Sequence, residues 1–167
     1  INDFGDDIKN VNINAQKKKG YNALMHAVTL PSFEIVEFLC NTFKDTIDIK
    51  KKNYDGFTAF MLATLNRNPS IVKFIYNSFK DNINSSDQNK NNDTALMIAA
   101  YNPKLEVITF LYRQFKGTFN VNKQNKNGDT LFMIAAYNPN IEIIKFVYKT
   151  FKDLINFTKK NVKGDNA

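Results

Sequence analysis

Apolar and polar segments alternate along this chain in a pattern that repeats every 36 residues. One position of the repeat carries glycine or asparagine, at Gly20, Gly56, Asn92, Gly128 and Gly164, with no gap between units. Such a period is the signature of stacked supersecondary units. It divides the chain into four full units, at about residues 13–48, 49–84, 85–120 and 121–156, and partial units at 1–12 and 157–167.

A short first helix is predicted directly after the glycine position of each unit. In three units threonine, a good helix N-cap, precedes apolar residues at helical spacing. The aligned segments are 22–27, 58–63, 94–99 and 130–135. We expect the helix to stop near the Asn-Pro pairs that end at Pro103 and Pro139.

A longer second helix follows, with one apolar face. In the first unit that face carries Ile35, Phe38, Leu39 and Phe43, at helical spacing. Three of the four helices have an acidic residue near the start, and all four have a lysine near the end, which suits the helix dipole. We therefore place the lysines in the last helical turn, at Lys44, Lys80, Lys116 and Lys152.

Polar segments separate each second helix from the next glycine position. We call residues 14–21, 50–57, 86–93, 122–129 and 158–165 the fingers, because they are too polar for a core and suit projecting loops or hairpins. Two antiparallel helices cannot bury their apolar face alone, so each unit must stack on the next. The pattern predicts an elongated, curved solenoid.

The repeated residues resemble the ankyrin repeat. The resemblance rests on Gly-x-Thr-x-Leu-x-x-Ala-Ala-type stretches such as Gly128–Ala136, followed by Ile141–Phe146 and by Ile155 and Asn156. It covers nearly the whole chain and implies a β-hairpin, helix, helix arrangement. The expected fold is an all-α repeat solenoid, an ankyrin-like stack of helix-turn-helix units with projecting finger loops or hairpins, cut from a longer array.

This chain departs from the ankyrin pattern at the histidine whose hydrogen bonds bridge neighbouring repeats in the family. Methionine stands there in all four units, at Met25, Met61, Met97 and Met133. We expect apolar packing to replace those hydrogen bonds. The unit is also 36 residues long instead of the family's usual 33, so the second helix and the fingers should be slightly long.

Composition restricts the class of protein. The chain has 167 residues, 43% of them hydrophobic, and no uninterrupted apolar run near the roughly 20 residues that span a bilayer. Its single cysteine, Cys40, cannot form an internal disulfide, and no Cys/His cluster has metal-ligand spacing. We expect a cytoplasmic or intracellular monomer with no cofactor or metal.

Enzymatic activity is not expected. His26 and Cys40 are the only histidine and cysteine, yet each occupies a repeat position that carries an apolar or aromatic residue in the other units. Both are most simply packing variants. The finger aspartates recur once per unit instead of converging on one cleft, and no glycine-rich phosphate loop is present.

All the net charge of the chain lies in the fingers. They hold 12 of the 23 basic residues and 5 of the 16 acidic ones, which accounts for the formal charge of +7 and leaves the rest neutral. A projecting row of lysines would attract an acidic protein segment or a nucleic-acid backbone. The alternative is that these lysines are merely solvated.

Ankyrin arrays, by resemblance, bind partners on a concave face formed by the finger tips and exposed positions of the first helix. Aromatic residues are over-represented at the corresponding positions here, where they would serve as anchors; Tyr101 and Tyr137 could instead pack between repeats. The candidate partner-binding residues are Lys18, Lys19, Tyr21, Lys51, Tyr54, Phe57, Leu65, Lys90, Tyr101, Lys126 and Tyr137.

Three functions fit these features. The first is a protein-interaction module that holds an acidic or mixed aromatic segment on the concave face. The second is binding of nucleic acid or another anionic surface, against which the fingers contain no arginine, the residue best suited to bidentate phosphate contacts. The third is a passive spacer that joins active domains.

Overall fold

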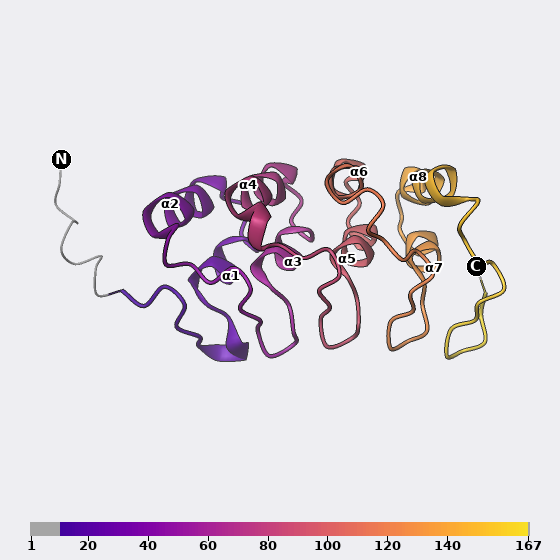
Figure 1. Cartoon of the computed structure of the whole chain (residues 1–167), viewed down its shortest axis with the longest axis horizontal. Helices are drawn as coiled ribbons and strands as arrows, with labels where there is room; N and C mark the ends of the chain where they lie inside the picture. Colours follow the sequence, from indigo (N-terminus) through magenta and orange to yellow (C-terminus); the bar gives the residue numbers. More distant parts are fainter. Residues whose placement is uncertain (1–10, 167) are drawn as a thin grey trace.

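The computed structural model describes residues 11–166 and arranges their helices in two rows (Figure 1). Each unit contributes one short inner helix and one long outer helix, and the fingers project beyond the inner row. The inner helices are α1 (Ala23–Ala27), α3 (Ala59–Ala63), α5 (Ala95–Tyr101) and α7 (Leu131–Ala136). The outer helices are α2 (Phe33–Phe43), α4 (Pro69–Phe79), α6 (Leu105–Gln114) and α8 (Ile141–Phe151). The predicted all-α repeat solenoid is confirmed.

The inner helices begin where the threonine pattern places them. The side chains of Asn22, Thr58, Thr94 and Thr130 each accept a hydrogen bond from the backbone N–H three residues later. That third residue is the repeated methionine, whose side chain is buried in every unit. The cap therefore orients the helix while the methionine anchors it in the core.

The prediction of a lysine in the last turn of each outer helix was wrong in detail. Lys44, Lys80 and Lys152 are the C-cap residues of α2, α4 and α8, and Lys116 lies beyond the C-cap Phe115 of α6. The final apolar residue completes the last turn, and the lysine follows as the chain turns away. All four lysines are exposed.

The fingers are hairpin-shaped loops without strands. Among residues 11–166 the only β-type pairings are two isolated bridges, between Gln88 and Thr94 and between Lys160 and Asn166. The β-hairpin that the resemblance implied is thus reduced to a turn. Most of the side-chain hydrogen bonds within a finger involve asparagine or glutamine. The asparagine Oδ1 accepts from backbone N–H groups, and the glutamine Nε2 donates to backbone carbonyls.

Aromatic pairs join neighbouring outer helices. Tyr76 of α4 meets Phe110 of α6 edge-on at 5.6 Å between ring centroids, and Tyr112 of α6 meets Phe146 of α8 in the same way at 5.8 Å. These pairs are 36 residues apart, and edge-to-face geometry is favourable for aromatic rings. The same contact therefore recurs from one unit to the next along one continuous core.

Asparagines link the turns between inner and outer helices. Asn102 donates hydrogen bonds to the carbonyl oxygens of Thr64 and Asn66, at 2.8 and 2.9 Å, and its Oδ1 accepts from the Lys104 N–H. Asn66 and Asn138 make the same three contacts in their units. We call Asn66, Asn102 and Asn138 the asparagine ladder. The expectation that apolar packing alone replaces the bridging hydrogen bonds was therefore incomplete.

Candidate functional site

The fingers have a defined shape because an asparagine closes each of the last four, buried in three of them and half-buried at Asn161. In the third finger, Oδ1 of Asn89 accepts the N–H groups of Asn91 and Asp93, both at 2.9 Å. A residue with positive φ completes the turn, and it is Gly56, Asn92, Gly128 or Gly164 in the successive fingers. Asn53, Asn125 and Asn161 accept equivalent pairs of N–H groups.

Neighbouring fingers are hydrogen-bonded to each other through their backbones. The N–H of Lys90 donates to the Asp55 carbonyl at 2.8 Å, and the N–H of Lys126 donates to the Asn91 carbonyl at 2.9 Å. Tyr54 and Val162 donate in the same way to the finger before them. These bonds hold the finger tips in one row along the molecule.

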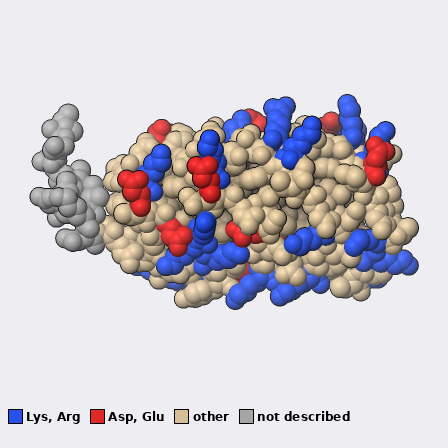
Figure 2. All heavy atoms as spheres, in the orientation of Figure 1, with Lys and Arg blue, Asp and Glu red and all other residues tan. Residues whose placement is uncertain are grey.

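Lysines gather on this row, at the edge of the molecule where the fingers project (Figure 2). Of the predicted lysines, Lys18, Lys19, Lys90 and Lys126 are exposed at finger turns. Lys51 is half-buried and lies before the turn of its finger, so the structure does not place it at a tip. A second set of basic side chains lies over the outer helices.

The predicted aromatic and apolar positions divide into two groups. Tyr101, Tyr137, Leu65 and Tyr54 have 44%, 66%, 43% and 63% of their surface exposed, so they are available to a partner. Tyr21 and Phe57 are half-buried and pack against the core. Tyr101 and Tyr137 therefore keep much of their side-chain surface free of the neighbouring repeats.

Two finger aspartates are buried behind these tyrosines. Asp93 is hydrogen-bonded by Asn89, Asn91 and Asn125, and Asp129 by Asn161. Burial, together with the charges of these two carboxylates and of Tyr137, raises the pKa of Tyr101 to about 12. These aspartates therefore act as structural charges that hold the finger asparagines.

The same column is aromatic in the first two units. Tyr21 and Phe57 stand where Asp93 and Asp129 stand later, and Nδ2 of Asn53 consequently has no hydrogen-bond partner among the described residues. The sequence shows this replacement, but only the structure shows that the aspartates and asparagines pair across units.

His26 and Cys40 lie in different surroundings, one exposed and one buried. The Cys40 thiol is buried, and burial raises its pKa to about 12, so it is not a thiolate at neutral pH. His26 is exposed and its ring lies 4.9 Å from that of Tyr21. Cys40 is therefore part of the core, whereas His26 contacts the Tyr21 ring at the surface.

Comparison with known families decides the assignment. The family model described as ankyrin repeats (3 copies) matches residues 5–87 and again residues 77–161. The chain belongs to the ankyrin-repeat family. Ankyrin repeats are generally protein–protein interaction modules and typically lack enzymatic activity. A search of curated proteins found no match.

Two further structural findings concern this ankyrin array. No group of three or more His, Cys, Asp or Glu side chains within residues 11–166 is placed to hold a metal ion. None of the helices formed by those residues has the length and hydrophobicity needed to cross a bilayer.

Proposed function

We propose that this ankyrin array binds an acidic segment of a partner protein along its concave face. The observation that carries the proposal is the row of lysines at finger tips, held in register by finger-to-finger hydrogen bonds beside the exposed rings of Tyr101 and Tyr137. Lysines steer an acidic chain toward the row, and aromatic anchors then dominate the affinity.

The position of the lysines supports a directed interaction over general solvation. Four of the finger lysines lie on exposed turns: Lys18, Lys19, Lys90 and Lys126. None of them forms an ion pair with a carboxylate among residues 11–166. Unpaired positive charges on a rigid frame form a constant attractive field. We expect the partner segment to carry several Asp or Glu residues with an apolar or aromatic residue among them.

A charge-reversal pair of variants tests the proposal. The first variant changes Lys18, Lys19, Lys90 and Lys126 to Glu, and the matched control changes Lys44, Lys80, Lys116 and Lys152 to Glu. Both alter the charge by the same amount at exposed sites, but the control residues lie at or just beyond the C-terminal ends of the outer helices. Binding partners are captured from lysate by each protein and compared by mass spectrometry.

The proposal predicts proteins that bind the native chain and the control but are at least tenfold depleted on the finger variant. Such proteins would support binding through the finger lysines on the concave face. Equal capture by all three proteins would refute a role for the finger lysines. If capture is lost on nuclease treatment and falls steeply with added salt, the ligand of the fingers is nucleic acid and not a protein.

A further inference from the structure

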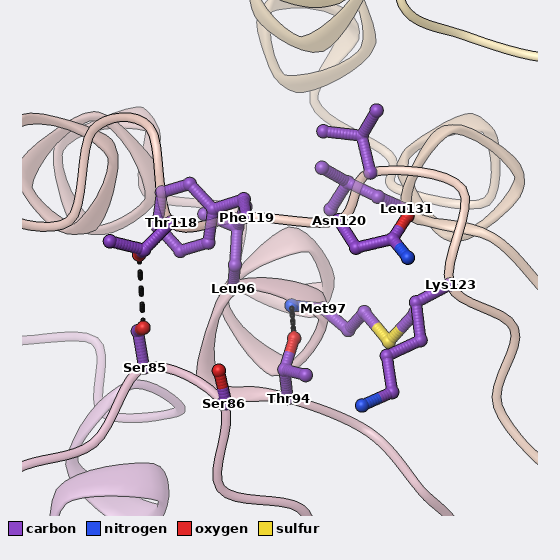
Figure 3. Close-up of a pocket in the computed structure, with 11 residues that line it drawn as sticks. Ser85, Ser86, Thr94, Leu96, Met97, Thr118, Phe119, Asn120, Lys123 and Leu131 are labelled. Atoms are coloured by element: carbon purple, nitrogen blue, oxygen red, sulfur yellow. Dashed lines mark hydrogen bonds between the residues drawn. The ribbon is translucent and has the colours of Figure 1, made fainter.

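A small pocket opens between the third and fourth units, apart from the concave face. It has a volume of about 70 Å³ and lies where the segment after α6 passes the start of α5 (Figure 3). Its floor is made by Leu96, Met97, Val121 and Leu131, all buried. Its rim is polar. None of the predicted partner-binding residues lines it.

The equivalent space between the second and third units is almost closed. Ten of the lining residues have a counterpart, 36 positions earlier, that lines a space of only about 10 Å³. Phe60 becomes Leu96, and Ile49 becomes Ser85. These two changes remove a ring and a branched side chain. Two other positions gain bulk, since Ile83 becomes Phe119 and Ala95 becomes Leu131, yet the space is larger than its counterpart.

The pocket also differs in charge from its counterpart, which is lined by Lys50 and Asp87 where this pocket has Ser86 and Lys123. Lys123 replaces Asp87, which lies 3.9 Å from Lys52 in the preceding unit. Lys123 lines the pocket from the rim, its side chain reaching toward the side where Ser86 and Thr94 lie (Figure 3). It has no carboxylate within 4.0 Å among residues 11–166, and no acidic residue lines the pocket.

Hydroxyl groups complete the polar side. The hydroxyls of Ser85 and Thr118 are hydrogen-bonded to each other at 2.9 Å, and Ser86 lies beside them on the exposed rim. The Thr118 hydroxyl donates to the Phe115 carbonyl at 2.8 Å, so Ser85 donates to Thr118 and neither hydroxyl has a proton left for a ligand. The groups that can donate to an anion are the hydroxyls of Ser86 and Thr94 and the ammonium group of Lys123, whereas the floor offers only apolar surface. The lining therefore suits a small molecule with an anionic head and an apolar tail.

The volume limits the size of that tail. A buried apolar cavity of about 150 Å³ accommodates the six carbons of benzene, so about half that volume takes roughly three aliphatic carbons. We propose that this pocket is a binding site for a short-chain aliphatic carboxylate, with its tail against Leu96 and Leu131 and its carboxylate at Lys123.

Sodium butyrate is the probe for this site, and its binding is measured on the full chain by NMR of ¹³C-labelled methyl groups. We expect saturable shifts at the methyls of Met97, Val121 and Leu131, with a dissociation constant of about 1–10 mM, as suits so small a ligand. Sodium chloride at the same ionic strength should leave these methyls unshifted.

The preceding unit supplies the two diagnostic variants. Leu96→Phe restores the ring present at Phe60 and should weaken butyrate binding more than tenfold by filling the tail site. Lys123→Asp restores the acidic residue present at Asp87 and should weaken binding at least fivefold. An unchanged amide spectrum confirms that each variant is folded, and neither change touches a finger lysine proposed to bind the partner.

The proposal is overturned by any of three results. These are no saturable shift up to roughly 50 mM butyrate, equal binding of 1-butanol and butyrate, or unaltered butyrate binding by Leu96→Phe. Loss of the protein partner in the charge-reversal experiment would leave these results unchanged, so the two proposals fail independently.

Discussion

Two residue positions, one in the finger and one in the preceding finger, decide whether the asparagine of a finger is fully hydrogen-bonded. Asn125 donates to Asp93 in the preceding finger at 2.8 Å, and Asn161 donates to Asp129 at 3.1 Å. Asn89 follows Phe57 and donates instead to Asp93 of its own finger at 3.1 Å. At Asn53 both positions are aromatic, Tyr21 and Phe57, and the amide nitrogen lacks a described partner although the residue is only 5% exposed. An unpaired buried donor costs stability.

Replacement by aspartate should therefore affect the free energy of unfolding very differently at Asn125 and at Asn53. Asn125→Asp places a carboxylate against that of Asp93 and should lower the free energy of unfolding by about 3 kcal/mol at pH 7. Asn53→Asp removes the unpaired donor and should cost less than about 1 kcal/mol. Urea unfolding measures both, and similar losses for the two variants would contradict the pairing. Part of the Asn125→Asp loss should be regained near pH 4, where carboxyl groups protonate.

The buried thiol of Cys40 should be chemically inert in the folded chain. Since its pKa is raised from 9.0 to about 12, the folded state keeps the thiol neutral at pH values where an unfolded cysteine ionises. The resulting stabilisation is complete below about pH 9 and is lost as the pH rises toward 12.

Iodoacetamide at pH 9 should alkylate Cys40 at least about 100-fold more slowly in the folded chain than in urea. The measurement is the rate of mass increase, and Cys40→Ala is the control for reaction elsewhere. Equal rates with and without urea would show that the thiol is accessible.

At the scale of elements, the finger depends on a turn residue in the left-handed region and on close contact with the next finger. Gly128 has a φ of 76°, and a Cβ placed on it would lie 2.8 Å from Cα of Asn161. Gly164 has a φ of 86° and open space around it. A comparison of substitutions at Gly164 and Gly128 therefore separates the cost of backbone strain from the cost of losing contact between fingers.

Gly164→Ala should lower stability by about 1–2 kcal/mol at most, from left-handed strain alone. Gly128→Ala carries that strain and a clash with backbone, so we expect a further loss of about 1–3 kcal/mol. Thermal unfolding followed by circular dichroism compares them. Equal melting temperatures would show that the fingers are not in contact as described.

The helices were largely predictable from the sequence, whereas the polar contacts were not. Threonine caps and apolar spacing located α3, α5 and α7 because these signals are local. The asparagine ladder was not predicted, because Asn102 and Asn138 lie in polar segments next to proline. Such segments are typical of exposed loops. Likewise, the pocket arises from Leu96 and Lys123 in different units, which only the stacking brings together.

At the scale of the whole molecule, each unit is stabilised by its neighbours. α5 packs on α3 and α7, whereas α7 contacts one inner helix, α5, within the described residues. In an array of this kind, stability is a sum of unit and nearest-neighbour terms. A defect at the end should therefore loosen one unit, and a defect in the middle should loosen several.

Two substitutions test whether a defect spreads only to neighbouring units: Ile98→Ala in α5 and Ile134→Ala in α7. Both side chains are buried at the same repeat position. Each truncation should cost about 2–4 kcal/mol locally. Hydrogen exchange should show loss of protection confined to α7 and α8 for Ile134→Ala, but extending into α3, α4, α7 and α8 for Ile98→Ala. Identical protection maps would indicate one all-or-none unit instead.

The pairing of Asp93 with Asn125 also restricts how such an array can be rearranged by gene duplication. Copying the third or fourth unit gives a junction whose aspartate meets the asparagine of the next finger, so the copies can be added in any number. Copying the second unit adds an asparagine that has Phe57 both in the preceding finger and in its own, which repeats the unpaired amide of Asn53. The array can therefore grow freely from its C-terminal units and only at a cost from its N-terminal ones.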